Sequence, residues 1–203
     1  MLQISTVAPN TLELLKKIQS ISELADTRLV GGTALAFHLG HRLSIDLDLF
    51  GSFEQEIITK ILSTESFNSF IVLSETNAVK HYLINQIKVD IVNYEQYQWL
   101  EKPLIEGQIR VAGLKDIAAM KIAAIANRGS KKDFIDLFFL LNIFDIHEII
   151  EFYKTKYSFS EVFFAIRSLS YFDDAEKDEM PKMYIQTKWE DVKKRVSAEV
   201  RQL

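Results

Sequence analysis

A run of alternating polar and apolar residues, Leu43–Phe50, constrains the fold of this chain more than any other feature. Asp46 and Asp48 are among its polar members, and apolar residues stand between them. A two-residue period is typical of a strand with one buried face, because successive side chains point to opposite faces of a sheet. The chain therefore needs a sheet with a core on one side, and both aspartates project from the other side.

The remaining patterns predict a mixed sheet in the first half and helices in the second. Strand-like runs occur at Arg28–Gly31, Ser69–Ser74, Val79–Ile84 and Ile87–Val92. Helical spacing of apolar residues occurs at 10–24, Thr33–Leu39, Gln55–Leu62, 114–127, 132–143, 146–154, 158–169 and Trp189–Val200. We therefore predict an α+β fold, with one unit at 1–110 and a helical unit at 111–203.

Composition indicates a globular protein and excludes several kinds of site. The 203 residues are 48% apolar and 26% charged, which is enough apolar surface for a core. The absence of cysteine excludes disulfides, thiol nucleophiles and thiolate metal ligands. The N-terminus has no signal-peptide pattern, and no apolar stretch is long enough to span a bilayer. We expect a cytoplasmic protein without a membrane partner.

Charge is distributed unevenly along the chain. The net charge is −4, yet the segment Arg110–Lys132 holds six basic residues and one acidic residue, a net charge of +5. A basic segment in an acidic protein is a candidate site for phosphates. The alternative is a solvated helix face.

The pair Gly31-Gly32 lies between a predicted strand and a predicted helix. Glycines allow a sharp turn there, and the free N–H groups of the helix start, with the Thr33 hydroxyl, suit a phosphate. Asp46 and Asp48 on one strand face repel each other unless a cation lies between them, and Mg²⁺ prefers such oxygen ligands. The alternatives are an ordinary turn, the solvated face of a strand and, for His41-Arg42, a surface loop pair.

A third carboxylate lies in the apolar run Ile87–Val92. An unpaired Asp90 would be costly there, so it could join Asp46 and Asp48 in a three-carboxylate cluster. The alternative is a surface aspartate paired with Lys88 or Lys80.

The helical half contains a second group of charges. Lys121 interrupts an apolar helical stripe, and Arg128 follows two turns later. Asp133 and Asp136 share a face of the next predicted helix. Charges on facing helices are costly unless they are paired or used, so they either serve a site or form a structural salt-bridge network.

Both groups lie within two motifs that resemble a known family. The stretch G-G-T-A-L, followed by G-H-R-x-S-x-D-L-D-L-F, is similar to the first signature of the AbiEii-type nucleotidyltransferases. The stretch K-I-A-A-I-A-N-R-G-S-K-K-D-F-I-D-L is similar to their second signature. These proteins are toxins of type IV toxin–antitoxin systems, and the MenT toxins are relatives.

The resemblance implies a polymerase-β-like nucleotidyltransferase core. It implies metal binding by Asp46 and Asp48, phosphate contacts from Gly32 and Thr33, and essential roles for Lys121 and Asp133. Thr33 stands where many nucleotidyltransferases have serine, which keeps the hydroxyl. The chain is short for this group, which leaves the acceptor less defined than the fold.

The resulting hypothesis is an enzyme that transfers a nucleoside monophosphate from an NTP to an acceptor hydroxyl. Asp46, Asp48 and Asp90 would hold two ions of Mg²⁺ or Mn²⁺, and Lys121 and Asp133 would complete the catalytic set. The expected nucleotide contacts are Gly31, Gly32, Thr33, Arg42, Ser44, Lys121 and Arg128. The resemblance implies an RNA acceptor, in particular a tRNA 3′ end, and a cognate antitoxin. The alternative is a nucleotide-binding module or the neutralising subunit of a two-component system.

Overall fold

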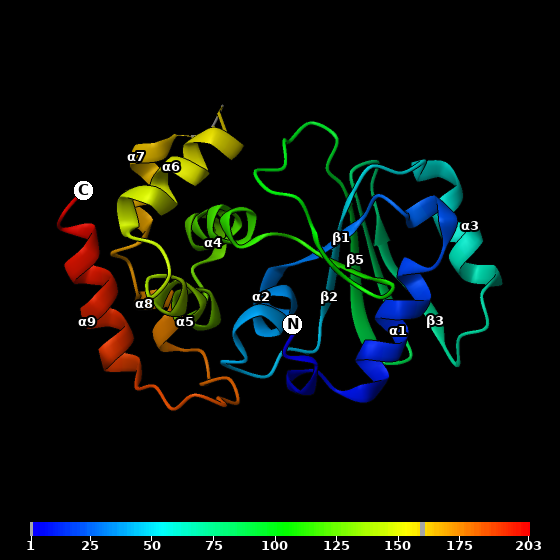
Figure 1. The fold of residues 1–203 in the computed structure, drawn as a ribbon, viewed down its shortest axis with the longest axis horizontal. Coiled ribbons are helices and arrows are strands. Elements are labelled where there is room, and N and C mark those ends of the chain that lie inside the picture. The colour runs from blue at the N-terminus through cyan, green and yellow to red at the C-terminus, as the bar shows by residue number, and fades with distance from the viewer. Residues whose placement is uncertain (1, 159–160) are drawn as a thin grey trace.

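The computed structural model describes residues 2–158 and 161–203, and a mixed sheet organises its first half (Figure 1). The strands are β1 (Arg28–Val30), β2 (Leu47–Gly51), β3 (Phe70–Glu75), β4 (Val79–Ile84), β5 (Ile87–Asn93), β6 (Leu104–Glu106) and β7 (Ile109–Val111). Their order in the sheet is β3-β4-β5-β2-β1-β7-β6. The pairs β2–β5 and β1–β7 are parallel, and the other neighbours are antiparallel.

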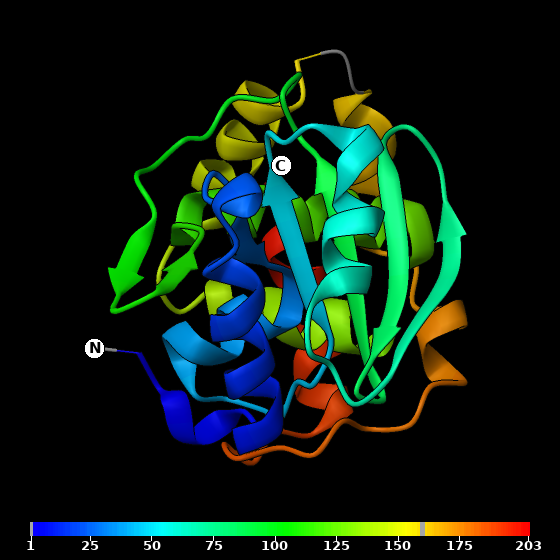
Figure 2. The ribbon, with the colours of Figure 1, turned by 90° about the vertical axis from the view of Figure 1, so that its right-hand side faces the viewer.

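Helices lie on both sides of this sheet. Two of them, α1 (Pro9–Gln19) and α3 (Gln55–Thr64), lie in front of the sheet in Figure 2 and cover one face. On the other side lie α2 (Gly31–Leu39), α4 (Leu114–Arg128), α5 (Lys131–Leu140), α6 (Ile146–Lys156), α7 (Val162–Ser168), α8 (Asp173–Glu176) and α9 (Trp189–Val200) (Figure 1). This arrangement confirms the predicted α+β class. The predicted helix 158–169 corresponds to α7 (Val162–Ser168), and residues 159–160 of that prediction lie outside the described residues.

The strand predicted at Leu43–Phe50 begins only at Leu47. The preceding residues pair instead with the segment between α8 and α9: the Leu43 N–H donates to the carbonyl oxygen of Lys182 at 2.9 Å, and Arg42 forms a bridge with Met183. The C-terminal segment therefore returns to the first half of the chain. Sequence patterns did not predict this contact because it joins segments 140 residues apart.

The two predicted strands Val79–Ile84 and Ile87–Val92 pair with each other as the β4–β5 hairpin. Ile84 pairs with Ile87, and the turn residues Asn85 and Gln86 have positive φ angles of 49° and 66°. A two-residue turn of this kind matches the twist of the paired strands. By contrast, β6 and β7 were not predicted, since three-residue strands are too short to show a period.

One part of the core lies between α1, α3 and the sheet face that carries Leu47, Leu49, Val89 and Ile91, all fully buried, and the core continues among the helices on the other side of the sheet. Alternate residues of β2 and β5 therefore point toward the opposite face, which faces the helical half. None of the described helices is long and apolar enough to cross a membrane.

Candidate active site

Two aspartates meet on the sheet face that looks toward α4. Asp48 of β2 and Asp90 of β5 are direct neighbours in the parallel register, so their side chains share a face. Asp46 precedes β2 by one residue, and its charge acts on the same group, since it contributes to the pKa shift of Asp48. The structure therefore places Asp48 beside Asp90, whereas Asp46 lies just before β2, and among the described residues the three carboxylates do not form a three-ligand metal group.

The two glycines at the start of α2 make room for this group. Gly31 has φ +70°, and a Cβ atom on it would overlap with the carboxylate of Asp48. A Cβ atom on Gly32 would overlap with the guanidinium of Arg42 and lie 3.2 Å from the Ser44 hydroxyl. No side chain caps the start of α2, so its first N–H groups lack a capping partner beside Asp48.

Thr33 holds the chain before β2 against α2. Its side chain is buried, and its hydroxyl lies 2.5 Å from the carbonyl oxygen of Asp46 and 2.9 Å from the hydroxyl of Ser44. The hydroxyl therefore fixes where Asp46 leaves the backbone.

The carboxylate of Asp48 is electrostatically strained. Burial, followed by the neighbouring charge of Asp90, raises its pKa to about 6 from an ordinary value of 3.8. Lys121 opposes this shift, while Asp46 adds to it. Among the described residues, no group donates a hydrogen bond to the side chain of Asp48 or Asp46, which leaves both carboxylates available for a ligand.

Asp90 has partners on both sides. His81 Nδ1 lies 2.7 Å from one oxygen, and Lys88 Nζ donates to the other at 2.9 Å. The pairing with Lys88 is the alternative that the sequence left open, whereas Lys80 pairs with Glu75. Sequence reasoning missed His81, although the hairpin turn at Asn85-Gln86 fixes a register in which His81 faces Asp90.

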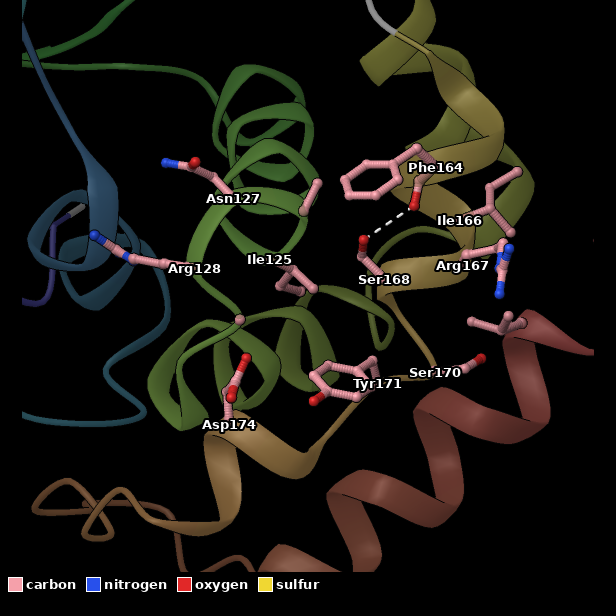
Figure 3. A pocket seen from close by; sticks show the side chains of 13 residues that line it. Ile125, Asn127, Arg128, Phe164, Ile166, Arg167, Ser168, Ser170, Tyr171 and Asp174 are labelled. Atoms are coloured by element: carbon pink, nitrogen blue, oxygen red, sulfur yellow. Dashed lines mark hydrogen bonds between the residues drawn. The ribbon is translucent and has the colours of Figure 1, made fainter.

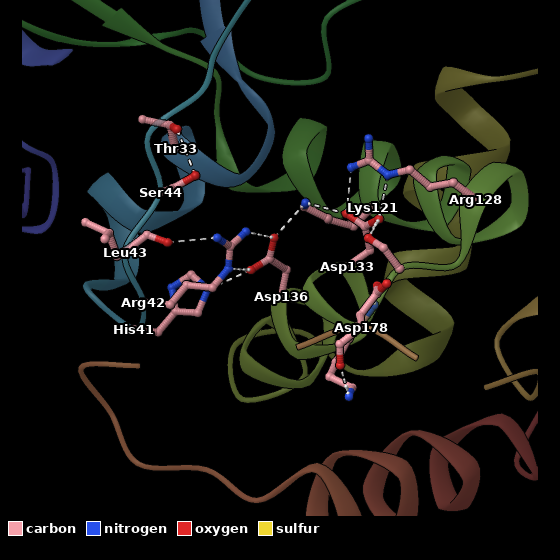
Figure 4. Close-up of polar contacts among 12 residues, drawn as sticks. Thr33, His41, Arg42, Leu43, Ser44, Lys121, Arg128, Asp133, Asp136 and Asp178 are labelled. Carbon is pink, nitrogen blue, oxygen red and sulfur yellow. Dashed lines mark hydrogen bonds and ion pairs between the residues drawn. The ribbon is translucent and has the colours of Figure 1, made fainter. Parts of the chain in front are cut away.

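A buried ion network, centred on Asp136 of α5, lies next to Gly32 through the side chain of Arg42 (Figure 4). Arg42 binds both carboxylate oxygens at 2.7 Å, and His41 Nε2 donates at 2.8 Å. Lys121 Nζ lies 2.6 Å from the same carboxylate. His41 and Arg42 are therefore not a surface pair, because they are 0% and 3% exposed.

Asp133, one turn earlier on α5, continues the network. It accepts hydrogen bonds from Lys121 at 3.0 Å, from Arg128 at 2.8 and 3.0 Å, and from the Ser130 hydroxyl at 2.7 Å (Figure 4). Lys121 thus bridges two fully buried carboxylates. The salt-bridge network that the sequence left open is present, and it lies next to the aspartates of the sheet.

The network carries an excess of positive charge. The cations of Arg42, Lys121 and Arg128 face the two carboxylates of Asp133 and Asp136. Although burial raises the pKa of Asp133 and Asp136, the adjacent cations outweigh it and hold both pKa values well below the ordinary range. Burial lowers the pKa of His41 more than Asp136 raises it, so this imidazole is neutral at pH 7. One positive charge therefore remains uncompensated within the group.

The basic segment Arg110–Lys132 does not form one surface. Arg110 donates to backbone carbonyls of Gln19, Leu24 and Thr27, and Lys131 contacts Asp178. Lys121 is buried in the network. These charges stabilise the fold, and we correct the expectation that the segment as a whole attracts phosphates.

An open cleft of about 370 Å³ separates the sheet face from α4. Asp48, Asp90 and His81 line it from the sheet, and Lys121 and Arg128 line it from α4. Gly31 forms part of its floor. A ligand in this cleft would touch carboxylates on one side and the cationic network on the other.

The carboxylates suit a divalent cation that is completed by a substrate. No group of three or more histidine, aspartate or glutamate side chains within residues 2–158 and 161–203 is arranged as a complete metal site. However, Asp46 and Asp48 offer hard oxygen ligands to which none of the described groups donates a hydrogen bond, and burial, followed by the charge of Asp90, raises the pKa of Asp48. Mg²⁺ is commonly held by one or two carboxylates together with phosphate oxygens, so the residues fit such an ion.

Comparisons with known proteins show one sequence relative and several proteins of similar fold. The chain is 36% identical over 188 residues to aq_aa25 of Aquifex aeolicus, with 89% of each chain covered. JHP933 from Helicobacter pylori has a similar fold, with a TM-score of 0.56 at 16% identity and 97% and 92% of the two chains covered. MenT4, a nucleotidyltransferase toxin from Mycobacterium tuberculosis, has a TM-score of 0.58 at 15% identity, with 95% and 85% covered.

A family model covers nearly the whole chain. The model of the AbiEii nucleotidyltransferase toxin, type IV toxin–antitoxin system, matches residues 14–202. The match includes the glycine pair, the aspartates of the sheet and the ion network of α4 and α5. This chain belongs to the AbiEii family of nucleotidyltransferase toxins.

Proposed function

We propose that this protein transfers a nucleoside monophosphate from an NTP to an acceptor hydroxyl and releases pyrophosphate. The observation that carries the proposal is the position of Asp48, which lies against Gly31 at the uncapped start of α2 and faces Lys121 and Arg128 across one cleft. Carboxylates for a cation, free N–H groups and fixed positive charge are the elements that phosphoryl-group chemistry requires.

The triphosphate would lie between the glycine pair and the network. The N–H groups at the start of α2 would donate to phosphate oxygens, with the Ser44 hydroxyl next to Gly32. Lys121 and Arg128 would stabilise the charge that develops on the phosphates. Arg42 donates to both carboxylate oxygens of Asp136, and Asp133 accepts from Lys121 and Arg128. We therefore assign to Asp133 and Asp136 the role of positioning these cations.

Asp46, Asp48 and Asp90 would hold Mg²⁺ or Mn²⁺, which supplies charge neutralisation and activation of the acceptor hydroxyl, in the manner of a two-metal site. Asp48 and Asp46 lack hydrogen-bond donors and are the direct ligands in this proposal. Asp90 is held by His81 and Lys88, so its orientation is fixed before a ligand arrives. The Thr33 hydroxyl donates a hydrogen bond to the backbone carbonyl oxygen of Asp46, and this contact fixes the position of Asp46.

The acceptor that we propose is an RNA 3′ hydroxyl, in particular that of tRNA. The likeness to the AbiEii-type and MenT toxins supports this choice. An antitoxin partner follows from membership of a toxin–antitoxin family, and we propose that a protein encoded next to this one neutralises it.

The test uses purified protein with each of the four α-labelled NTPs, Mg²⁺ and total cellular RNA. We expect one or more NTPs to label RNA, and we expect Asp48→Asn to abolish the label. Asp26→Asn, which changes an exposed aspartate outside the cleft, is the matched control and keeps full activity. Nucleotide binding without transfer to RNA, protein or a small molecule would instead support the nucleotide-binding module.

Growth provides a separate test of the toxin role. Inducible expression of the wild-type protein should slow bacterial growth, and expression of Asp48→Asn at the same level should not. Sequencing of RNA 3′ ends after induction should reveal added nucleotides. Normal growth together with transfer in vitro to another acceptor would support nucleotidyltransferase activity and contradict the toxin role.

A further inference from the structure

A second hollow opens beside the cleft, at the C-terminal end of α4 (Figure 3). It has a volume of about 750 Å³ and is lined by α4, by α7 and the segment that follows it, and by the end of α9. Asn127 and Arg128 line both the hollow and the cleft. A molecule in the hollow would therefore lie next to a ligand in the cleft.

Two aromatic rings at this hollow face solvent. Phe164 is 59% exposed and Tyr171 is 53% exposed, and both line the hollow (Figure 3). Neither ring stacks on another ring of the described residues, unlike Phe134, Phe172 and Trp189 nearby. Exposed aromatic faces in a hollow mark a binding surface, and flat ligands such as nucleobases stack on them.

The same hollow contains a cation and several hydroxyl groups. Arg167 of α7 is exposed and forms no ion pair with the described residues. Ser168, Ser170 and Tyr171 contribute hydroxyls, and Asp174 is the acidic residue on the lining. The Arg167 guanidinium lies 5.9 Å from the centroid of the Phe163 ring. Aromatic faces together with an exposed arginine suit a single nucleic-acid strand, because the strand offers bare bases and a phosphate backbone at once.

We propose that this hollow holds the last nucleotides of a single-stranded RNA acceptor. Phe164 and Tyr171 stack against bases, and Arg167 contacts a phosphate. The 3′ hydroxyl then passes Asn127 and Arg128 to reach the α-phosphate beside Asp48. The inference rests on the proposed function, since it names the place where the acceptor of that reaction binds.

The charge of the protein agrees with a short contact. The net charge is −4, and two of the six basic residues of Arg110–Lys132, namely Lys121 and Lys131, are buried, so this segment does not present one continuous basic surface. Stacking depends less on charge than backbone binding does. A double helix also hides its base faces, so the hollow selects an unpaired end.

The experiment measures binding of a fluorescent hexauridine RNA by anisotropy, without NTP. We expect Phe164→Ala and Tyr171→Ala each to weaken binding about tenfold. The controls are Tyr184→Ala, which alters a 44% exposed ring outside the hollow, and Ile143→Ala, which alters a 44% exposed apolar side chain outside it. Both controls should stay within about twofold of the wild type. All four side chains are exposed, so the variants should fold.

The proposed phosphate contact of Arg167 is tested by the salt dependence of RNA binding. The slope of log Kd against log salt should fall by about 0.7 in Arg167→Ala, because one phosphate contact is lost. Lys194→Ala, an exposed cation of α9 outside the hollow, should keep the wild-type slope.

Binding of a non-hydrolysable NTP with Mg²⁺ separates this inference from the proposed function. We expect every variant above to bind the NTP as the wild type does. If the wild-type protein binds the NTP but hexauridine binding is absent or unchanged in Phe164→Ala and Tyr171→Ala, the hollow is not the acceptor site. If a duplex RNA binds as tightly and with the same dependence on these rings, selection of a single strand is wrong. Failure of NTP binding and transfer in the wild type would reject the proposed function itself.

Discussion

The carboxylate of Asp48 lies where a Cβ atom of Gly31 would otherwise stand. Gly31 also has φ +70°, in the left-handed region, and it begins α2. One position therefore combines a turn from strand to helix with close approach of a carboxylate to the backbone. A residue with a side chain would be strained at this φ angle and would collide with Asp48, which explains why the first residue of α2 is a glycine.

Gly31→Ala should therefore remove activity and destabilise the fold. The matched control is Gly107→Ala, because Gly107 has φ +61° but nothing within 4 Å of an added Cβ. The control should lose about 1 kcal/mol in the free energy of unfolding, which is the cost of a left-handed non-glycine residue. Gly31→Ala should lose more, since Asp48 must also move. Chemical denaturation measures both, and equal losses would show that Asp48 does not press on Gly31.

Lys121→Met should lower stability as well as activity. The substitution keeps the apolar stem but leaves Asp133 and Asp136, both 0% exposed, with one cation fewer. Removing one partner of a buried ion pair costs about 3 kcal/mol. Lys115→Met, which changes a lysine of the same helix with a 44% exposed side chain, should stay within about 0.5 kcal/mol of the wild type. A similar small loss in Lys121→Met would mean that Arg42 and Arg128 suffice for the carboxylates.

The stability of the metal-free protein should depend on pH through two opposing groups. The pKa of Asp48 is raised from 3.8 to about 6, so the unfolded chain ionises first and this group lowers stability as pH rises from about 4 to about 6. The pKa values of Asp133 and Asp136 are lowered, so their contribution is present above about 4 and is lost as pH falls below it.

Comparison of the wild type with Asp48→Asn isolates the first group. The melting temperature of the variant minus that of the wild type should increase between pH 4 and pH 6 and then stay constant, measured in EDTA. A difference that does not change over this range would show that burial and Asp90 do not act on Asp48.

The sequence predicted part of the sheet face of the site, because the alternation along β2 is local information. Alternation indicated that Asp48 points away from the core, and the structure adds that Asp90 of β5 is its neighbour and that Asp46 lies before the strand. The ion network was only partly predictable. Lys121 and Asp133 stood out as charges in apolar stripes, but the contact of Asp136 with His41 and Arg42 joins residues 95 and 94 positions apart.

The same limit applies to the strand that begins at Leu47. Periodicity extended it to Leu43, but it cannot reveal that residues 42 and 43 pair with Met183 and Lys182. The second hollow could not be predicted from the sequence either. Phe164 and Tyr171 look like ordinary apolar residues of a helical region, and only the packing of α7 against α4 leaves their rings in solvent.

The most direct test of nucleotidyl transfer compares two labels in the preferred NTP, one on the α-phosphate and one on the γ-phosphate. With Mg²⁺ and RNA, the wild-type protein should transfer the α-label to RNA and release the γ-label in pyrophosphate, and Asp48→Asn should do neither. Asp26→Asn should behave as the wild type. Transfer of the γ-label to the acceptor, or α-label transfer that survives in Asp48→Asn, would contradict the account.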